Sequence, residues 1–213
     1  MRRIAIFGDI ILDQTTTVRT VGVSKENDAV VVAHEKDRSY NLGGAANVAA
    51  NCKSLGGDPV LLGCYNNHTV QRLIEAAKIT HVTDRGAEGH TPVKNRIVTA
   101  DGHYLLRVDK EDCPHGHPAE FWRNGGGTYG MWIKEAFKLN PLPVFCLVDY
   151  DKGFLSGGAV NHSMWNVRSI HESFKFPVIV DPGRNGSWAK YSSPRTIFRA
   201  NLHQAMQHYV RNI

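Results

Sequence analysis

The stretch RIAIFGDIILD, residues 3–13, decides the fold of this chain. Its apolar run ends in Gly8-Asp9, which is the pattern of a buried strand that delivers a polar residue at its carboxyl end. In open parallel sheets, binding residues gather at that end. Asp9 and Asp13 are therefore candidates to accept hydrogen bonds from neighbouring sugar hydroxyls, with stabilisation of a turn as the alternative role.

A helix with a glycine-rich start follows about thirty residues later in the segment GGAANVAANCKSLGG, residues 43–57. Apolar residues recur in it at helical spacing, and Gly56-Gly57 ends it as a C-cap would. Gly43 and Gly44 would let a ligand approach the backbone N–H groups at the helix start, and Asn47 offers both a donor and an acceptor. The aspartates and this helix start together predict a sugar pocket.

Strands and helices alternate along the rest of the chain. Further apolar strands are expected at 60–63, 144–148, 178–180 and, more weakly, 196–198, with amphipathic helices at 70–77 and 160–167. This alternation predicts a parallel sheet.

Two regions interrupt the alternation, and each contains two segments that are typical of exposed strands. They are residues 15–20, 29–35, 93–100 and 103–108, and Asp101-Gly102 joins the last two as a tight hairpin turn. We expect these strands to form a small β-sheet lid over the mouth of the main sheet.

Composition excludes several classes of protein. The 213 residues are 42% hydrophobic and include 20 glycines, which is ordinary for a globular protein. Four cysteines without a Cys-x-x-Cys pair argue against zinc ribbons and disulfide scaffolds. No apolar run approaches the roughly 20 residues needed to cross a bilayer, so we expect a cytoplasmic protein without membrane contact. The net charge of +5 favours anionic ligands of any kind.

Other chemistries have weak support. The sequence contains no Walker loop, Gly-x-Ser-x-Gly elbow or His-Glu-x-x-His motif. The segment CPHGH, residues 113–117, holds soft and imidazole ligands but lacks an obvious remainder for zinc, so a polar loop is the favoured interpretation. Trp122, Trp132, Trp165 and Trp188 are interpreted as packing residues, which disfavours nucleic acid as a partner.

Several motifs together resemble the ribokinase-like (PfkB) carbohydrate kinases, and within them the heptose-7-phosphate kinase branch. The motifs are GDIILD (8–13), SKENDAVVV (24–32), GGAANVA (43–49), TPVKNRIV (91–98), LRVD (106–109), DYDKG (149–153) and VDP (180–182). The resemblance implies an α/β fold with an open, mostly parallel sheet flanked by helices and a small β lid. It further implies one C-terminally truncated domain over 1–213, with lid strands around 14–40 and 91–109.

The resemblance also implies roles for individual residues. Sugar hydroxyls would be held by Asp13, Gly43, Gly44 and Asn47. The substrate's phosphate would be bound by Lys94, Arg96 and Arg107 on the lid, where a solvated hairpin face is the alternative. Asp149 is assigned to the substrate, and Lys152, Arg184 and Asn201 to the nucleotide cofactor.

The departures from the family pattern concern catalysis. The Gly-Ala-Gly-Asp element, whose aspartate is the family's catalytic base, is absent from the sequence, so no catalytic residue is assigned. Gln204 stands where a carboxylate involved with magnesium would be expected, and the usual Asp-Pro-Lys reads Asp181-Pro182-Gly183, followed by Arg184. ATP and Mg²⁺ are thus implied as cofactors, but binding by this chain alone is in doubt.

Two functions are favoured, and a nucleic-acid-binding protein that exploits the positive charge is a third, less favoured alternative. The first is an ATP-dependent sugar kinase acting on a sugar or sugar phosphate such as a heptose 7-phosphate, incomplete as an isolated chain. The alternative is a non-catalytic sugar-phosphate-binding protein or pseudokinase subunit. In either case, the exposed edge of a truncated sheet predicts a homo-oligomer or a partner chain that covers it.

Overall fold

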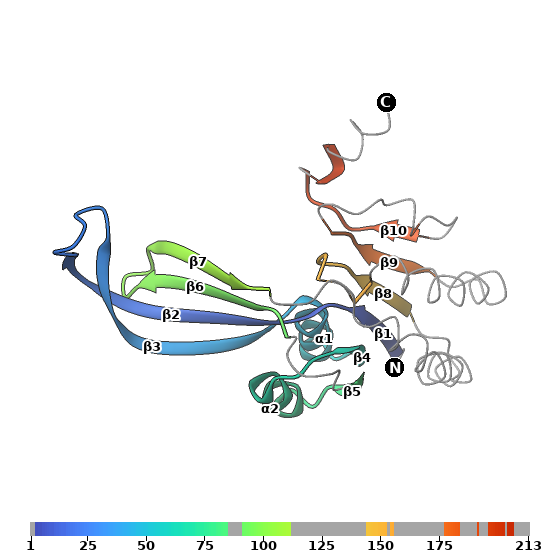
Figure 1. The fold of residues 1–213 in the computed structure, drawn as a ribbon. Helices are drawn as coiled ribbons and strands as arrows, with labels where there is room; N and C mark the ends of the chain where they lie inside the picture. The colour runs from blue at the N-terminus through green and yellow to red at the C-terminus, as the bar shows by residue number, and fades with distance from the viewer. Residues whose placement is uncertain are drawn as a thin grey trace.

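The computed structural model describes residues 3–84, 91–111, 144–152, 154–155, 177–183, 191, 196–202 and 204–206. These residues form a six-stranded sheet with strand order β10-β9-β8-β1-β4-β5 and a four-stranded sheet with order β3-β2-β6-β7. The four-stranded sheet projects as an arm from one end of the larger one (Figure 1). We call the four-stranded sheet the lid.

The larger sheet is parallel throughout. Its strands are β1 (Arg3–Gly8), β4 (Asp58–Cys64), β5 (Thr80–Asp84), β8 (Val144–Val148), β9 (Val178–Asp181) and β10 (Thr196–Phe198). Ala5 and Phe7 of β1 pack into one core cluster, whereas Ile6 packs into another on the opposite face. Because side chains alternate along a strand, an apolar run such as that of β1 can fill both faces of a central strand.

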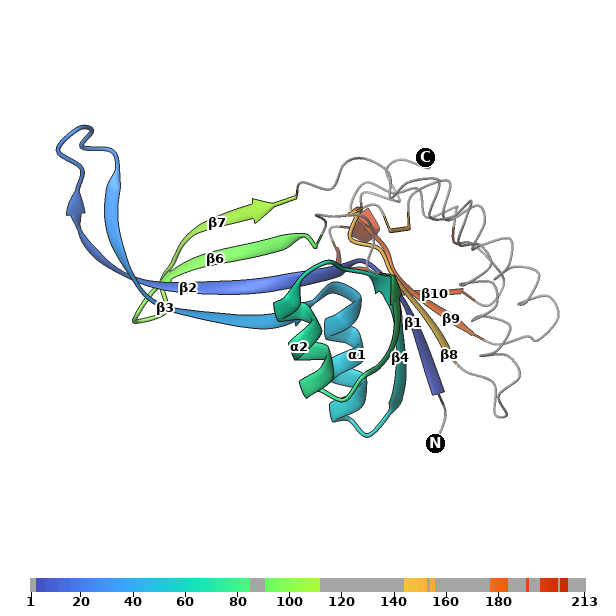
Figure 2. The same cartoon turned by 60° about the horizontal axis from the view of Figure 1, so that its bottom comes forward.

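Two helices lie on one face of this sheet, as Figure 2 shows. The first, α1 (Gly44–Ser54), buries Ala45, Ala46 and Ala49, small residues that allow the helix to lie close to β1 and β4. The second, α2 (His68–Ala76), is capped by Asn67, whose side-chain oxygen accepts the backbone N–H groups of the next turn. Among the described residues, no helix is long and apolar enough to cross a membrane.

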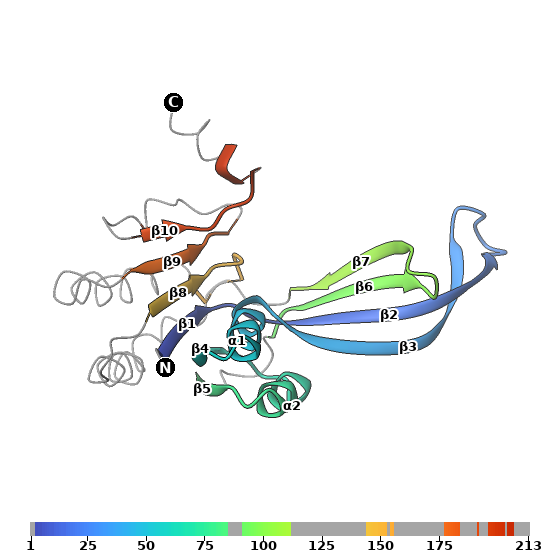
Figure 3. The same cartoon turned by 180° about the vertical axis from the view of Figure 1, so that it is seen from behind.

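The lid consists of β2 (Ile10–Val23), β3 (Val31–Gly43), β6 (Val93–Thr99) and β7 (Tyr104–Lys110). β2 pairs antiparallel with β3 and parallel with β6, and β6 pairs antiparallel with β7 through the turn at Gly102. Its base adjoins the end of β1 and the start of α1, as seen from behind in Figure 3. The sequence predicted these strands, but β2 and β3 are longer than expected.

Two further differences from the sequence-based expectations concern β2 and β5. Because β2 begins at Ile10, Asp13 lies on a lid strand and not at the tip of a strand of the main sheet. Strand β5, which pairs with β4 at the edge of the sheet, was not predicted. Its sequence THVTD carries only one aliphatic residue, Val82, so it lacks the apolar run by which the other strands were found. The expected helix at 160–167 lies outside the described residues.

Candidate functional site: a cavity between the lid and the sheet

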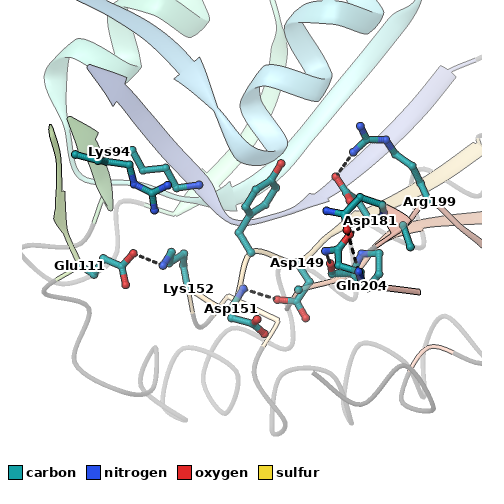
Figure 4. A pocket seen from close by; sticks show the side chains of 14 residues that line it. Lys94, Glu111, Asp149, Asp151, Lys152, Asp181, Arg199 and Gln204 are labelled. Atoms are coloured by element: carbon teal, nitrogen blue, oxygen red, sulfur yellow. Dashed lines mark hydrogen bonds and ion pairs between the residues drawn. The ribbon is translucent and has the colours of Figure 1, made fainter. Parts of the chain in front are cut away.

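A cavity of about 520 Å³ lies where β8, β9 and β10 end and where the base of the lid meets them. It is lined by Lys94, Arg107, Glu111, Asp149, Tyr150, Asp151, Lys152, Asp181, Pro182, Gly183, Arg199, Ala200, Asn201 and Gln204. Figure 4 shows Lys94 and Glu111 at one end, Asp181, Arg199 and Gln204 at the other, and Asp149 and Asp151 between them. The cavity therefore occupies the carboxyl edge of a parallel sheet, where open α/β proteins bind their ligands.

Asp9 fixes the segment after β8 that forms one wall of this cavity. Its buried carboxylate accepts the backbone N–H groups of Tyr150 at 2.7 Å, Phe154 at 3.0 Å and Lys152 at 3.2 Å. Burial raises its pKa from 3.8 to about 6, against the opposing effect of these hydrogen bonds. Of the two roles considered for Asp9, the structure shows the stabilisation of a turn.

Asp149 is buried at the start of the same segment. Its carboxylate accepts a hydrogen bond from the Tyr191 hydroxyl, and its other oxygen accepts the backbone N–H of Asp151 at 2.9 Å. Burial, followed by the charge of Asp149, raises the pKa of Tyr191, so this tyrosine stays protonated and donates. Tyr191 was missed by sequence reasoning because no local pattern links it to position 149.

The lid contributes cations to one end of the cavity. The Lys94 ammonium lies 4.5 Å from the centre of the Tyr150 ring, and burial lowers its pKa. Arg107 donates to Asp109 on its own strand, and Lys152 pairs with Glu111, which follows β7. In the described part of the chain, no carboxylate lies within ion-pair distance of Lys94.

The centre of the cavity holds a second carboxylate, that of Asp151. This residue adopts a positive φ of 57°, which aspartate tolerates better than most side chains. Its carboxylate lies over Gly183, because a Cβ added at position 183 would lie 2.5 Å from it. A glycine at the place of the family's lysine therefore leaves room for Asp151.

At the far end, Asn201 and Gln204 close a reciprocal capping box. Each side-chain oxygen accepts the other residue's backbone N–H at 2.9 Å. The Gln204 amide also donates to the Pro182 carbonyl at 2.8 Å, a bond that a glutamate could not form. Nearby, Arg199 donates to Asp181 at 2.8 Å, which opposes the upward effect of burial on the pKa of Asp181.

The resemblance implies magnesium as a cofactor, but Gln204 stands where a magnesium-binding carboxylate would be expected. Gln204 supplies an amide whose nitrogen and oxygen are both used within the protein. Within the ranges that the structure describes, no group of three or more His, Cys, Asp or Glu residues is placed to hold a metal ion. Gln204 therefore does not take the place of a magnesium-binding carboxylate.

The predicted sugar-binding residues lie at the junction of the lid and α1. The Arg96 guanidinium donates to Asp13 at 2.9 Å, and Gly43 lies directly against the same carboxylate.

Gly44 begins α1 with a φ of +58°, and a Cβ there would lie 2.1 Å from the Asp9 carbonyl oxygen. Asn47 is exposed, and the Asn51 amide donates to its side-chain oxygen at 3.4 Å.

The structure thus divides the predicted site residues into groups. Lys94, Arg107, Asp149, Lys152 and Asn201 line the cavity. Asp13, Arg96, Gly43, Gly44 and Asn47 lie at the junction of the lid and α1, beside the cavity. Arg184, the CPHGH segment and the four tryptophans lie outside the described residues. Besides Tyr191, sequence reasoning assigned no role to Glu111, which lies in no recognisable motif, or to Arg199, which lies two residues before Asn201.

Comparison with solved structures defines the class of fold. Ribokinase from Giardia lamblia aligns with a TM-score of 0.62 at 13% identity, over 97% of this chain and 64% of that chain. A Methanocaldococcus jannaschii nucleoside kinase, an archaeal member of the ribokinase family, aligns with a TM-score of 0.55 at 18% identity, over 99% and 64%. The chain has a ribokinase-like α/β fold, as predicted.

Sequence relatives show which type of carbohydrate kinase the chain is similar to. The bifunctional protein HldE of Campylobacter jejuni subsp. doylei is 29% identical over 212 residues, which is 96% of this chain and 41% of the relative. A D-beta-D-heptose 7-phosphate kinase of Bordetella bronchiseptica is 31% identical over 194 residues, 84% of this chain and 53% of the relative. The predicted resemblance to ribokinase-like (PfkB) carbohydrate kinases of the heptose 7-phosphate kinase type is confirmed.

The chain spans 41% of the length of the HldE relative and 53% of the Bordetella kinase. No family model matches it.

Proposed function

We propose that this chain binds a sugar phosphate, of the heptose 7-phosphate class, as the acceptor side of a carbohydrate kinase reaction. The observation that carries the proposal is Lys94, a half-buried ammonium at the lid end of the cavity with no carboxylate partner in the described residues. Burial disfavours this charge, the carboxylates of Asp13 and Asp109 and the Tyr150 ring offset only part of that effect, and a bound phosphate would add a direct counter-ion. Arg107 lies in the same wall and adds a guanidinium.

The remaining assignments follow from this orientation. With the phosphate at the lid, the sugar would extend toward Asp13, Gly43, Gly44 and Asn47, whose polar groups would hold its hydroxyls. Asp149, Lys152 and Asn201 line the rest of the cavity, where the phosphate donor would approach. The names of the kinase relatives imply ATP as that donor. We also propose a cytoplasmic location, as expected from the sequence.

Thermal unfolding tests the proposal. Heptose 7-phosphate should raise the melting temperature, whereas the unphosphorylated heptose should raise it less, because the bound ligand stabilises only the folded state. Lys94→Met should remove most of the difference between the two ligands. Lys36→Met, which changes an exposed lysine of β3 away from the cavity, is the matched control and should retain it. A melting temperature unaffected by every sugar phosphate would contradict the proposal.

A non-catalytic sugar-phosphate-binding protein is the second candidate function. The engagement of Gln204 with the Pro182 carbonyl supports it, because the end of the cavity then offers an amide where a magnesium-binding carboxylate is expected. The two functions differ in turnover. Release of ADP from ATP that depends on the sugar phosphate would establish the kinase, and ligand binding without turnover would favour the binding protein.

Self-association is proposed as well. Among the described strands, β10 lies at the edge of the main sheet and leaves Ile197 57% exposed, and Tyr104 and Leu106 on the lid are 57% and 55% exposed. Exposed strand edges and apolar patches of this kind are covered by partner chains in many proteins. One structural neighbour is a tetrameric form of Escherichia coli phosphofructokinase-2. Light scattering that gives a mass above 23.7 kDa would support a homo-oligomer, and a monodisperse monomer would contradict it.

A further inference from the structure

The Asp13 carboxylate is fixed by contacts on two sides. On one side, Arg96 Nη1 donates to Asp13 Oδ1 at 2.9 Å. On the other, Asp13 Oδ2 lies against Gly43, so that a Cβ added at position 43 would approach it to 2.7 Å. Arg96 of the lid therefore fixes one carboxylate oxygen by a hydrogen bond. Gly43, which has no side chain, leaves space for the other oxygen.

Three elements meet at this carboxylate. Asp13 lies on β2 opposite Lys94 of β6, and Arg96 is two residues further along β6, so its side chain reaches back toward Asp13. Gly43 ends β3 and is the N-cap residue of α1. The positive end of a helix dipole favours a carboxylate beside it, which adds to the attraction of the guanidinium. The carboxylate is thus oriented before any ligand binds.

Arg96 and Arg107 occupy facing positions on β6 and β7, yet their surroundings differ. Arg107 lines the cavity and donates to Asp109. Arg96 is not among the residues that line the cavity, and its carboxylate partner is Asp13. The two lid arginines therefore lie in different surroundings, although the sequence predicted that both bind the substrate's phosphate.

We propose that Arg96 is a positioning residue that holds the Asp13 carboxylate for the sugar hydroxyls, and that it does not bind the substrate's phosphate. This inference rests on the proposed function, because it assumes that Asp13 accepts hydrogen bonds from a bound sugar. Phosphate recognition then belongs to Lys94 and Arg107. Arg96 affects every sugar that uses Asp13, whether or not the sugar carries a phosphate.

Calorimetric titration of heptose 7-phosphate and of the unphosphorylated heptose separates the two roles. Arg96→Gln should weaken binding of both sugars by a similar factor, on the order of tenfold, because about 1.4 kcal/mol of oriented hydrogen bonding is lost. Arg107→Gln is the matched control on the facing strand, and it should weaken binding of the phosphorylated sugar only. Arg96→Lys keeps the charge without the planar fork and should restore part of the affinity for both.

A double-mutant cycle tests the coupling to Asp13. In the Asp13→Asn background, Arg96→Gln should cause little further loss of affinity, because the group that it positions is already altered. Urea unfolding of each variant, without ligand, shows whether the fold is retained. Arg96→Lys provides the measurement if Arg96→Gln does not fold.

Three outcomes would overturn the inference. A loss confined to the phosphorylated sugar in Arg96→Gln would make Arg96 a phosphate ligand. Additive losses in the double variant would show that Arg96 acts independently of Asp13. If the wild-type chain bound neither sugar, the proposed function itself would fail, and the positioning role would fail with it, whereas the first two outcomes leave sugar binding intact.

Discussion

Asp9→Asn probes how the fold supports the cavity, through the dependence of stability on pH. Asp9 is 3% exposed, and three backbone N–H groups of the segment after β8 donate to its carboxylate. Burial disfavours the charged carboxylate, whereas the three hydrogen bonds favour it. Because burial is the larger effect, the pKa of Asp9 is raised to about 6. The side chain is therefore expected to destabilise the fold when it is ionised.

The sign and size of the effect follow from linkage. Below pH 3.8, Asp9 is protonated in the folded and unfolded chains, and no difference arises. As the pH rises toward 6, the unfolded chain loses this proton first, so folding becomes less favourable. The difference between 3.8 and about 6 corresponds to about 3 kcal/mol. This stability is present at acid pH and lost as the pH rises through about 6.

Urea unfolding of the wild type and of Asp9→Asn, measured from pH 4 to above neutrality, isolates this contribution. Subtracting the two free energies of unfolding removes the titration of groups common to both chains. The wild type should lose up to about 3 kcal/mol relative to the variant across this range. A difference that stays constant, or that moves in favour of the wild type as the pH rises, would refute the reasoning. In the second case, the three N–H donors would outweigh burial.

Three further substitutions test other contacts. Gly44→Ala should lower the free energy of unfolding by about 2 kcal/mol or more, because of its positive φ and the nearby Asp9 carbonyl, and thermal unfolding measures the loss. Gln204→Glu should cost about 1–2 kcal/mol, since a carboxylate cannot donate to the Pro182 carbonyl, and the same measurement checks it. Lys94→Met should leave the melting temperature without ligand unchanged or higher, because a half-buried charge is removed.

Each of these substitutions has a result that would count against it. A stable Gly44→Ala variant would mean that the start of α1 accommodates a side chain. Gln204→Met can neither donate to Pro182 nor accept the Asn201 N–H, so it should lose more stability than Gln204→Glu. An undiminished stability in Gln204→Glu would mean that the bond to Pro182 contributes little. A lower melting temperature in Lys94→Met would show that the contact with Tyr150 outweighs the burial of the ammonium.

Regular elements with a strong apolar pattern could be predicted from the sequence. The runs at β1, β4, β8 and β9 identified buried strands, and the spacing in α1 identified a helix, because a central parallel sheet needs residues that are apolar on both faces. β5 could not be found in this way, since an edge strand with one aliphatic residue carries little such signal. The strands of the lid were predicted, but the apolar pattern did not show that β2 and β3 extend to the base of the lid.

The sequence by itself determined the α/β class, the lid, the glycine pair at the start of α1 and the resemblance to sugar kinases, because these depend on local patterns and short motifs. Only the tertiary structure decided which side chains pair. In the folded chain, Asp9 accepts backbone N–H groups of the segment after β8, and Asp149 accepts the Tyr191 hydroxyl. Asp13 lies between Arg96 and Gly43. These contacts join residues from 30 to 145 positions apart. A local pattern does not record such contacts, because the sheet and the lid bring the partners together only when the chain folds.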